Sequence, residues 1–134
     1  MLYLLDTNAW VHYLKNPNSI VAQRVERTPV KEIAVCSIVW AELLHGARKY
    51  EKRDAREARV EETLRHHPQL TFDKLAARRY AEIRDTLESR GEVIGLFDMQ
   101  IAAIALVHDL TVVTNNVSEF RRVDGLRVED WSVV

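Results

Sequence analysis

Acidic and amide side chains recur along this chain just past apolar segments or near the start of predicted helices. They are Asp6, Glu42, Asp98, Asn116 and Glu119. Three or four carboxylates brought to one place would repel one another unless a cation lay among them. Oxygen ligands of this kind suit Mg²⁺ or Mn²⁺. Such a site can hold a phosphodiester, lower the pKa of an attacking water and neutralise charge on the leaving oxygen.

Each of these residues also has an ordinary structural role open to it. Asp6 and Asp98 suit helix N-caps, and Asn116 suits a turn. Glu42 and Glu119 would otherwise be solvent-facing helix residues. Their recurrence after separate strands favours one shared site over five unrelated roles.

The elements that must position these residues are predicted from hydrophobic patterning. Short apolar runs predict buried strands at 2–5, 33–36 and 111–114, with shorter strands at 70–72 and 126–128. Helical spacing and end signals predict helices at 8–14, 20–27, from 38 onward, at 50–67, 74–90 and 99–107. Ser19, Ser37 and Asp73 are expected to cap helices, and Gly91 to end one.

This alternation of strand and helix predicts an α/β fold, a three-layer α/β/α domain with a mostly parallel central sheet. Ligands of such sheets bind at the carboxyl ends of the strands. We therefore expect Asp6, Asp98 and the turn at Asn116 to converge there, with Glu42 reaching the same edge from its helix.

Length and composition limit the possibilities further. The 134 residues fit one domain, 1–134, and the net charge of −1 provides no overall basic field for nucleic acid. The single Cys36 excludes an internal disulfide, and the five histidines show no ligand spacing. No apolar run is long enough to cross a bilayer and the start lacks signal-peptide features, so we expect a cytoplasmic protein with no membrane partner.

Several motifs together resemble the PIN-domain ribonucleases, and most closely the VapC toxins of bacterial toxin-antitoxin pairs. They are Leu4–Asn8, Ser37–Gly46, Phe97–Ala102 and Thr114–Phe120, followed by Gly125-Leu126 and Glu129–Trp131. The resemblance spans nearly the whole chain and depends on the order of the motifs rather than on any one of them.

The resemblance implies an endoribonuclease dependent on Mg²⁺ or Mn²⁺. Asp6, Glu42 and Asp98 take the family's acidic places, and Asn116 stands where the family often has a fourth acid. In the mechanism that we expect, Asp6 and Asp98 bind the metal, with Asn116 as a further candidate ligand. Glu42 orients or deprotonates the attacking water, and Glu119 supplies the missing charge.

The expected mechanism also gives roles to supporting and RNA-binding residues. Thr7, Asn8 and Thr114 are expected to donate hydrogen bonds that orient the metal-binding carboxylates. Candidates for contact with RNA phosphates are Lys49, Arg121 and Arg122. The implied substrate is structured RNA, commonly a tRNA, with initiator tRNA as the first candidate.

The implied protein partners are a VapB-like antitoxin and a second copy of the chain in a homodimer. In the family, the antitoxin binds in a groove that reaches the active site, and the charged segment 49–65 is expected near it.

Other functions that use a similar sheet edge fit less well. A receiver domain needs an acidic pair after its first strand and a late lysine, yet Thr7 follows Asp6 and no lysine follows Lys74. A haloacid-dehalogenase-like phosphatase needs an aspartate where Asn8 stands. The remaining alternative is a non-catalytic PIN-like module that binds RNA or another protein.

Overall fold

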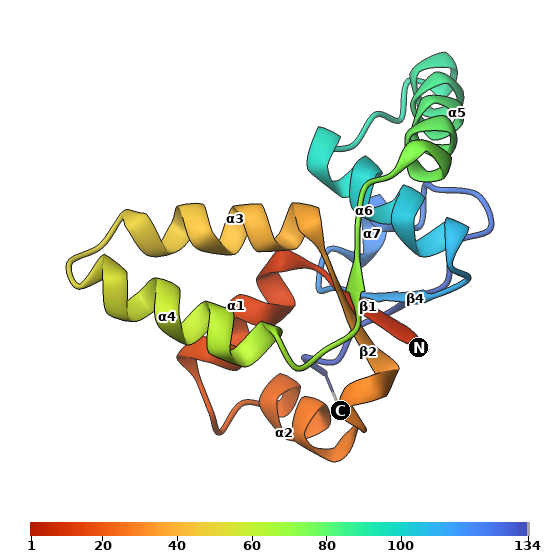
Figure 1. Cartoon of the computed structure of the whole chain (residues 1–134). Coiled ribbons are helices and arrows are strands. Elements are labelled where there is room, and N and C mark those ends of the chain that lie inside the picture. Colours follow the sequence, from red (N-terminus) through yellow and green to blue (C-terminus); the bar gives the residue numbers. More distant parts are fainter. Residues whose placement is uncertain (134) are drawn as a thin grey trace.

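The computed structural model describes residues 1–133 as a five-stranded sheet with helices on both faces (Figure 1). Its strands are β1 (Tyr3–Leu5), β2 (Ile33–Cys36), β3 (Gln69–Leu70), β4 (Thr111–Val113) and β5 (Val128–Glu129). Its α-helices are α1 (Thr7–Lys15), α2 (Ile20–Arg27), α3 (Ser37–Arg48), α4 (Arg53–Leu64), α5 (Lys74–Arg90), α6 (Leu96–Val107) and α7 (Val117–Phe120), and a 3₁₀ turn covers Val30–Glu32. The predicted α/β fold is confirmed.

The strand order is β3-β2-β1-β4-β5, and every pairing is parallel. The chain therefore first winds outward from β1 to β2 and β3, then crosses back to β4 on the other side of β1. Right-handed crossovers place the helices of these two halves on opposite faces of the sheet, with α1–α4 on one side and α5–α7 on the other (Figure 1). The direction reverses between β1 and β4, which is where such sheets bind ligands.

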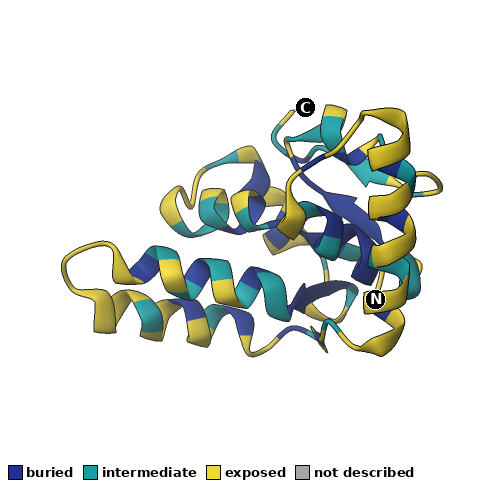
Figure 2. Cartoon of the chain, turned by 90° about the horizontal axis from the view of Figure 1, so that it is seen from above, coloured by how far each residue is buried: buried dark blue, intermediate teal, exposed yellow. Residues whose placement is uncertain are grey.

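The core runs through the strands and α6. All four residues of β2 are fully buried, and α6 is buried on most of its faces because it packs between the sheet and α5. Figure 2 shows buried strands at the centre and exposed outer faces on the surrounding helices. At the edge, the buried Trp131 packs edge-on against Tyr3, with ring centroids 4.9 Å apart. Within residues 1–133, no helix combines the length and apolarity that crossing a membrane requires.

Several helix ends follow local sequence signals. Ser19 and Asp73 accept hydrogen bonds from backbone N–H groups three residues on, and Gly91 ends α5 with φ +68°, all as predicted. The predicted cap at Ser37 is wrong, because Cys36 leaves β2 directly into α3 and is itself the N-cap residue. The Ser37 hydroxyl instead accepts a hydrogen bond from the Phe72 backbone N–H at 3.2 Å, which joins α3 to the segment after β3.

A buried histidine connects helix α1 to strand β2. The ring of His67 lies edge-on to Trp10 with centroids 5.0 Å apart, and its Nδ1 pairs with the Ile33 carbonyl at 3.0 Å. Burial lowers the pKa of His67 below its usual value of 6.5. Protonating this ring therefore costs more in the folded chain than in the unfolded chain.

We expect His67 to make the fold less stable in acid. Its contribution to the free energy of unfolding is fully present above about pH 6.5 and declines as the pH falls toward the lowered folded-state pKa. Denaturant unfolding at several pH values should show a smaller acid loss for His67→Phe than for the wild type. The exposed His108, changed to Gln, is the matched control, and an unchanged acid loss in His67→Phe would contradict the assignment.

Candidate active site

Asp6 lies at the carboxyl end of β1 and is 4% exposed. Its Oδ1 accepts a hydrogen bond from the Ala9 backbone N–H at 2.9 Å, so Asp6 caps α1. Its Oδ2 accepts a hydrogen bond from the Thr114 hydroxyl at 2.5 Å, which links the carboxyl ends of the neighbouring strands β1 and β4. The two roles left open by the sequence are therefore compatible, because the cap orients one carboxylate oxygen while the other faces the end of β4.

Burial is also the largest influence on the acidity of Asp6. It raises the pKa of Asp6 above the usual 3.8, and the charge of Glu42 raises it further. The hydrogen bonds from Thr114 and Ala9 act in the opposite direction by stabilising the carboxylate, as does the charge of His12 on α1. His12, which the sequence suggested was a surface or packing residue, thus acts on the site electrostatically.

Glu42 reaches the same edge from the second turn of α3. Its Oε1 accepts a hydrogen bond from the Thr7 hydroxyl at 2.6 Å, although the two residues are 35 positions apart. Since Thr7 is the first residue of α1, this bond ties the start of α1 to α3. The prediction that Thr7 orients a site carboxylate is consistent with this contact.

Asp98 lies in the first turn of α6 and is partly buried. It does not cap the helix, because α6 begins at Leu96 with Gly95 as its N-cap. The expectation of a helix starting at Met99 is therefore wrong. A Cβ on Gly95 would lie 3.6 Å from Asp98 Oδ2, so this glycine leaves one side of the carboxylate open.

The pKa of Asp98 is raised from 3.8 to about 6. The largest cause is burial, followed by the negative charges of Asp6, Glu119 and Glu42. The side chain of Asn116 acts in the opposite direction and partly offsets these effects. This raised pKa is consistent with the expectation that the four acidic residues lie near one another at this edge of the sheet.

Asn116 and Glu119 complete this corner from the turn after β4 and from α7. The Asn116 Nδ2 donates to Glu119 Oε2 at 3.0 Å, and the Asn116 backbone N–H donates to the Thr114 hydroxyl at 2.9 Å. Thr114 thus receives one hydrogen bond and gives one to Asp6. Through this chain of contacts, the β4 turn sets the positions of Asp6, Asp98 and Glu119 together.

The donor set suits a divalent cation, although its side chains do not stand at metal-ligand spacing. Carboxylates and an amide oxygen are the hard donors that Mg²⁺ and Mn²⁺ prefer, and the raised pKa of Asp98 records negative charge that a cation would neutralise. Within residues 1–133, no three acidic, histidine or cysteine side chains already stand at ligand spacing around one point. Hydrogen bonds to Thr7, Thr114 and Asn116 hold the carboxylates instead.

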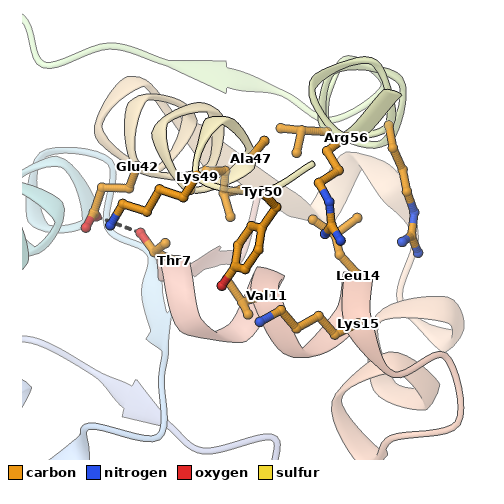
Figure 3. Close-up of a pocket in the computed structure, with 13 residues that line it drawn as sticks. Thr7, Val11, Leu14, Lys15, Glu42, Ala47, Lys49, Tyr50 and Arg56 are labelled. Carbon is orange, nitrogen blue, oxygen red and sulfur yellow. Dashed lines mark hydrogen bonds between the residues drawn. The ribbon is translucent and has the colours of Figure 1, made fainter. Parts of the chain in front are cut away.

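The other predicted site residues differ in their exposure and in the contacts that they make. Asn8 is exposed on α1, and among the described residues no hydrogen bond joins its side chain to the carboxylates. Lys49, at the end of α3, runs back toward Glu42 and Thr7 (Figure 3). Arg121 is exposed after α7, whereas a guanidinium nitrogen of Arg122 donates to the Val93 carbonyl at 3.3 Å and supports the loop before α6.

A groove of about 250 Å³ leads away from the cluster between α1, α3 and α4 (Figure 3). Thr7 and Glu42 lie at the end nearest the carboxylates. The hydrophobic pattern of each helix taken alone did not predict this groove, because its walls come from three helices. The only sequence signal was the charged segment 49–65, whose Arg56 and Arg59 line it.

Comparison with known proteins identifies similar chains across nearly the full length. A PIN-domain family model matches residues 3–126. The chain is 36% identical to the tRNA(fMet)-specific endonuclease VapC of Shigella flexneri, over 97% of this chain and 98% of that one. It is 35% identical to the ribonuclease VapC2 of Rickettsia felis, over 98% of both.

A solved structure agrees with the same grouping. The DNA-bound VapBC crystal structure from Salmonella typhimurium contains a chain 35% identical to this one, with a TM-score of 0.90 over 98% of this chain and 99% of that one.

We expect Asp98→Asn to stabilise the metal-free protein. The substitution removes one of four repelling charges, and we expect a gain of roughly 1 kcal/mol at neutral pH, a value reduced for the partial exposure of the side chain. The gain should shrink below about pH 6, where Asp98 is increasingly protonated in the wild type. Unfolding in EDTA measures it, with the exposed Asp85→Asn on α5 as control; a loss of stability would contradict the repulsion.

Proposed function

This chain belongs to the PIN-domain family and to its VapC branch, and on that premise we propose that it is a toxic endoribonuclease. It hydrolyses RNA phosphodiester bonds with Mg²⁺ or Mn²⁺ and is silenced by a VapB-like antitoxin. The observation that carries the proposal concerns the charge around Asp98. The negative charges of Asp6, Glu42 and Glu119 all raise the pKa of Asp98.

Asp6 and Asp98 would hold the cation, because Asp6 follows β1 where the winding of the sheet reverses and its charge acts on Asp98. The amide of Asn116 donates from Nδ2 to Glu119 at 3.0 Å, and its Oδ1 would be the atom that it offers to a cation. When bound, the metal supplies charge neutralisation at the phosphate and a more acidic water. An amide in this place contributes no negative charge, and Glu119 supplies the fourth carboxylate from one helical turn away.

Glu42 is suited to orient or deprotonate the attacking water. Its Oε1 is engaged by the Thr7 hydroxyl at 2.6 Å, which leaves Oε2 as an acceptor with a fixed direction. Thr114 plays the corresponding part for Asp6. These two hydroxyls preorganise the carboxylates, and such supporting contacts are commonly worth 10- to 100-fold, an order-of-magnitude figure, in metal affinity or activity.

The proposed substrate is a tRNA, with initiator tRNA as the first candidate, since the relative from Shigella flexneri is named for that RNA. Lys49 points toward the carboxylates, and Arg121 is exposed beside α7. These two cations are the candidates for contact with RNA phosphates. Arg122 contributes less directly, because it is bonded to the Val93 carbonyl.

The remaining proposals concern assembly and location. The solved relative from Salmonella typhimurium is a VapBC complex, which supports an antitoxin partner for this chain. We further propose that the chain is a single domain that forms a homodimer and acts in the cytoplasm, where tRNA is available.

The decisive experiment is metal-dependent RNA cleavage by matched variants. With Mg²⁺ and total bacterial RNA, we expect Asp6→Asn and Asp98→Asn to cut more than about 100-fold more slowly than the wild type. Asp85→Asn should cut normally, and EDTA should stop all cutting. Sequencing of new 5′ ends should place the main cut in initiator tRNA.

Three outcomes of this experiment would count against the proposal. Undiminished cutting by either variant would remove that residue from the metal site, and cutting in EDTA would remove the metal. A wild-type protein that binds RNA without cutting it would indicate the non-catalytic module instead.

A further inference from the structure

The groove beside the active site has an apolar floor. The floor is formed by Val11, Leu14, Leu43, Ala47 and Val60. Two of these residues come from α1, two from α3 and one from α4, so the floor exists only because the three helices pack together. Burying apolar side chains on such a floor contributes about 25 cal/mol for each square ångström removed from water.

The groove also has a defined direction. Thr7 and Glu42 lie at its site end. Lys15 lies eight residues further along α1, and Tyr50 lies eight residues past Glu42, in the connection between α3 and α4. At about 1.5 Å per helical residue, the two ends are roughly 12 Å apart. A bound segment would therefore reach the carboxylates at one end and a different chemical environment at the other.

The far end is a cluster of two cations that lie over one aromatic ring, which we call the Tyr50 cluster. It consists of Lys15, Tyr50 and Arg56. The Lys15 Nζ lies 6.0 Å from the ring centroid of Tyr50, and the Arg56 Cζ lies 4.8 Å from it. Tyr50 is 53% exposed, so the ring and its two cations are open to a ligand (Figure 3).

These cations have no acidic partner of their own. Across residues 1–133, neither Lys15 nor Arg56 forms an ion pair, whereas Arg48, Arg65, Arg79, Arg84, Arg90 and Arg127 all do. Lys49 and Arg59 add further positive charge to the groove, and its only carboxylate, Glu42, is engaged by Thr7. The far end is thus strongly basic in a protein whose net charge is −1.

We propose that the Tyr50 cluster is a recognition subsite for an acidic side chain of the inhibitory antitoxin. This inference rests on the proposed function, and it adds which end of the groove selects the partner and by what chemistry. The bound segment covers the apolar floor and directs a carboxylate between Lys15 and Arg56. The active-site carboxylates attract basic groups, so the two ends together fix the direction in which the segment lies.

The apolar floor favours a protein segment over RNA as the occupant. A phosphodiester backbone gains little from covering Val11, Leu43 and Ala47, because each phosphate must lose water without finding a donor there. An amphipathic peptide gains from both the floor and the charged end. RNA binding at this cluster is therefore the competing outcome that the experiment must distinguish.

The test uses synthetic amphipathic peptides and the intact protein. The parent peptide carries an arginine, then leucines at helical spacing, then a glutamate two helical turns from the arginine. Two further peptides replace the glutamate with glutamine or lysine. Fluorescence anisotropy should rank glutamate above glutamine above lysine, with about five-fold weaker binding for the lysine peptide than for the glutamate peptide.

A charge-reversal variant makes the ranking specific to the cluster. In the Lys15→Glu/Arg56→Glu protein we expect the ranking of the glutamate and lysine peptides to reverse. Lys74→Glu/Arg78→Glu, on the exposed part of α5, is the matched control and should keep the wild-type ranking. RNA cleavage without peptide should be the same in both variants as in the wild type.

The outcomes separate this inference from the proposed function. Equal binding of the three peptides, binding of none, or an unchanged ranking in the Lys15→Glu/Arg56→Glu protein would overturn the subsite. Loss of RNA cleavage in that variant alone would also overturn it and assign the cluster to RNA. If the wild type cuts no RNA at all, the proposed function fails, while the peptide ranking still reports on the groove.

Discussion

Mutual repulsion among carboxylates is the constraint around which the rest of this structure is arranged. Asp6, Glu42, Asp98 and Glu119 come from four separate elements, and bringing them together raises the pKa of Asp98 to about 6. Folding tolerates this cost because hydroxyl and amide donors on Thr7, Thr114 and Asn116 stabilise the charged forms. A divalent cation would relieve the remaining repulsion, so the repulsion among the carboxylates would also be the source of their affinity for metal.

The parallel sheet makes this arrangement possible. Because β1 and β4 are neighbours and point the same way, Asp6 and the turn at Asn116 lie side by side although they are 110 residues apart in the chain. The reversal of winding direction at β1 then brings α3 from one face and α6 from the other to the same edge. The groove along α1, α3 and α4 begins at this edge, which gives a bound partner direct access to the carboxylates.

Much of the site could be predicted from sequence, because buried parallel strands show as short apolar runs and the polar residues follow them directly. Asp6 was placed in this way, whereas Asp98 was placed by the apolar helix pattern that follows it. The cap at Ser37 was predicted wrongly, because its hydroxyl accepts a hydrogen bond from the Phe72 backbone N–H. Helix-end rules use only local sequence and cannot predict a contact between distant segments. Asp98 was placed one turn too early in its helix because Gly95, rather than an acidic residue, is the N-cap of α6. The Tyr50 cluster was missed for a related reason: Lys15, Tyr50 and Arg56 meet only when three helices pack.

The central claim is that the carboxylate cluster binds a divalent cation through Asp6 and Asp98. Anomalous diffraction from crystals soaked in Mn²⁺ tests this most directly, because the metal is located without reference to activity. The account predicts the strongest anomalous peak within coordination distance of Asp6 and Asp98, about 2.0–2.2 Å from their oxygens, and its loss in Asp6→Asn crystals. A strongest peak elsewhere, or one that persists in that variant, would contradict it.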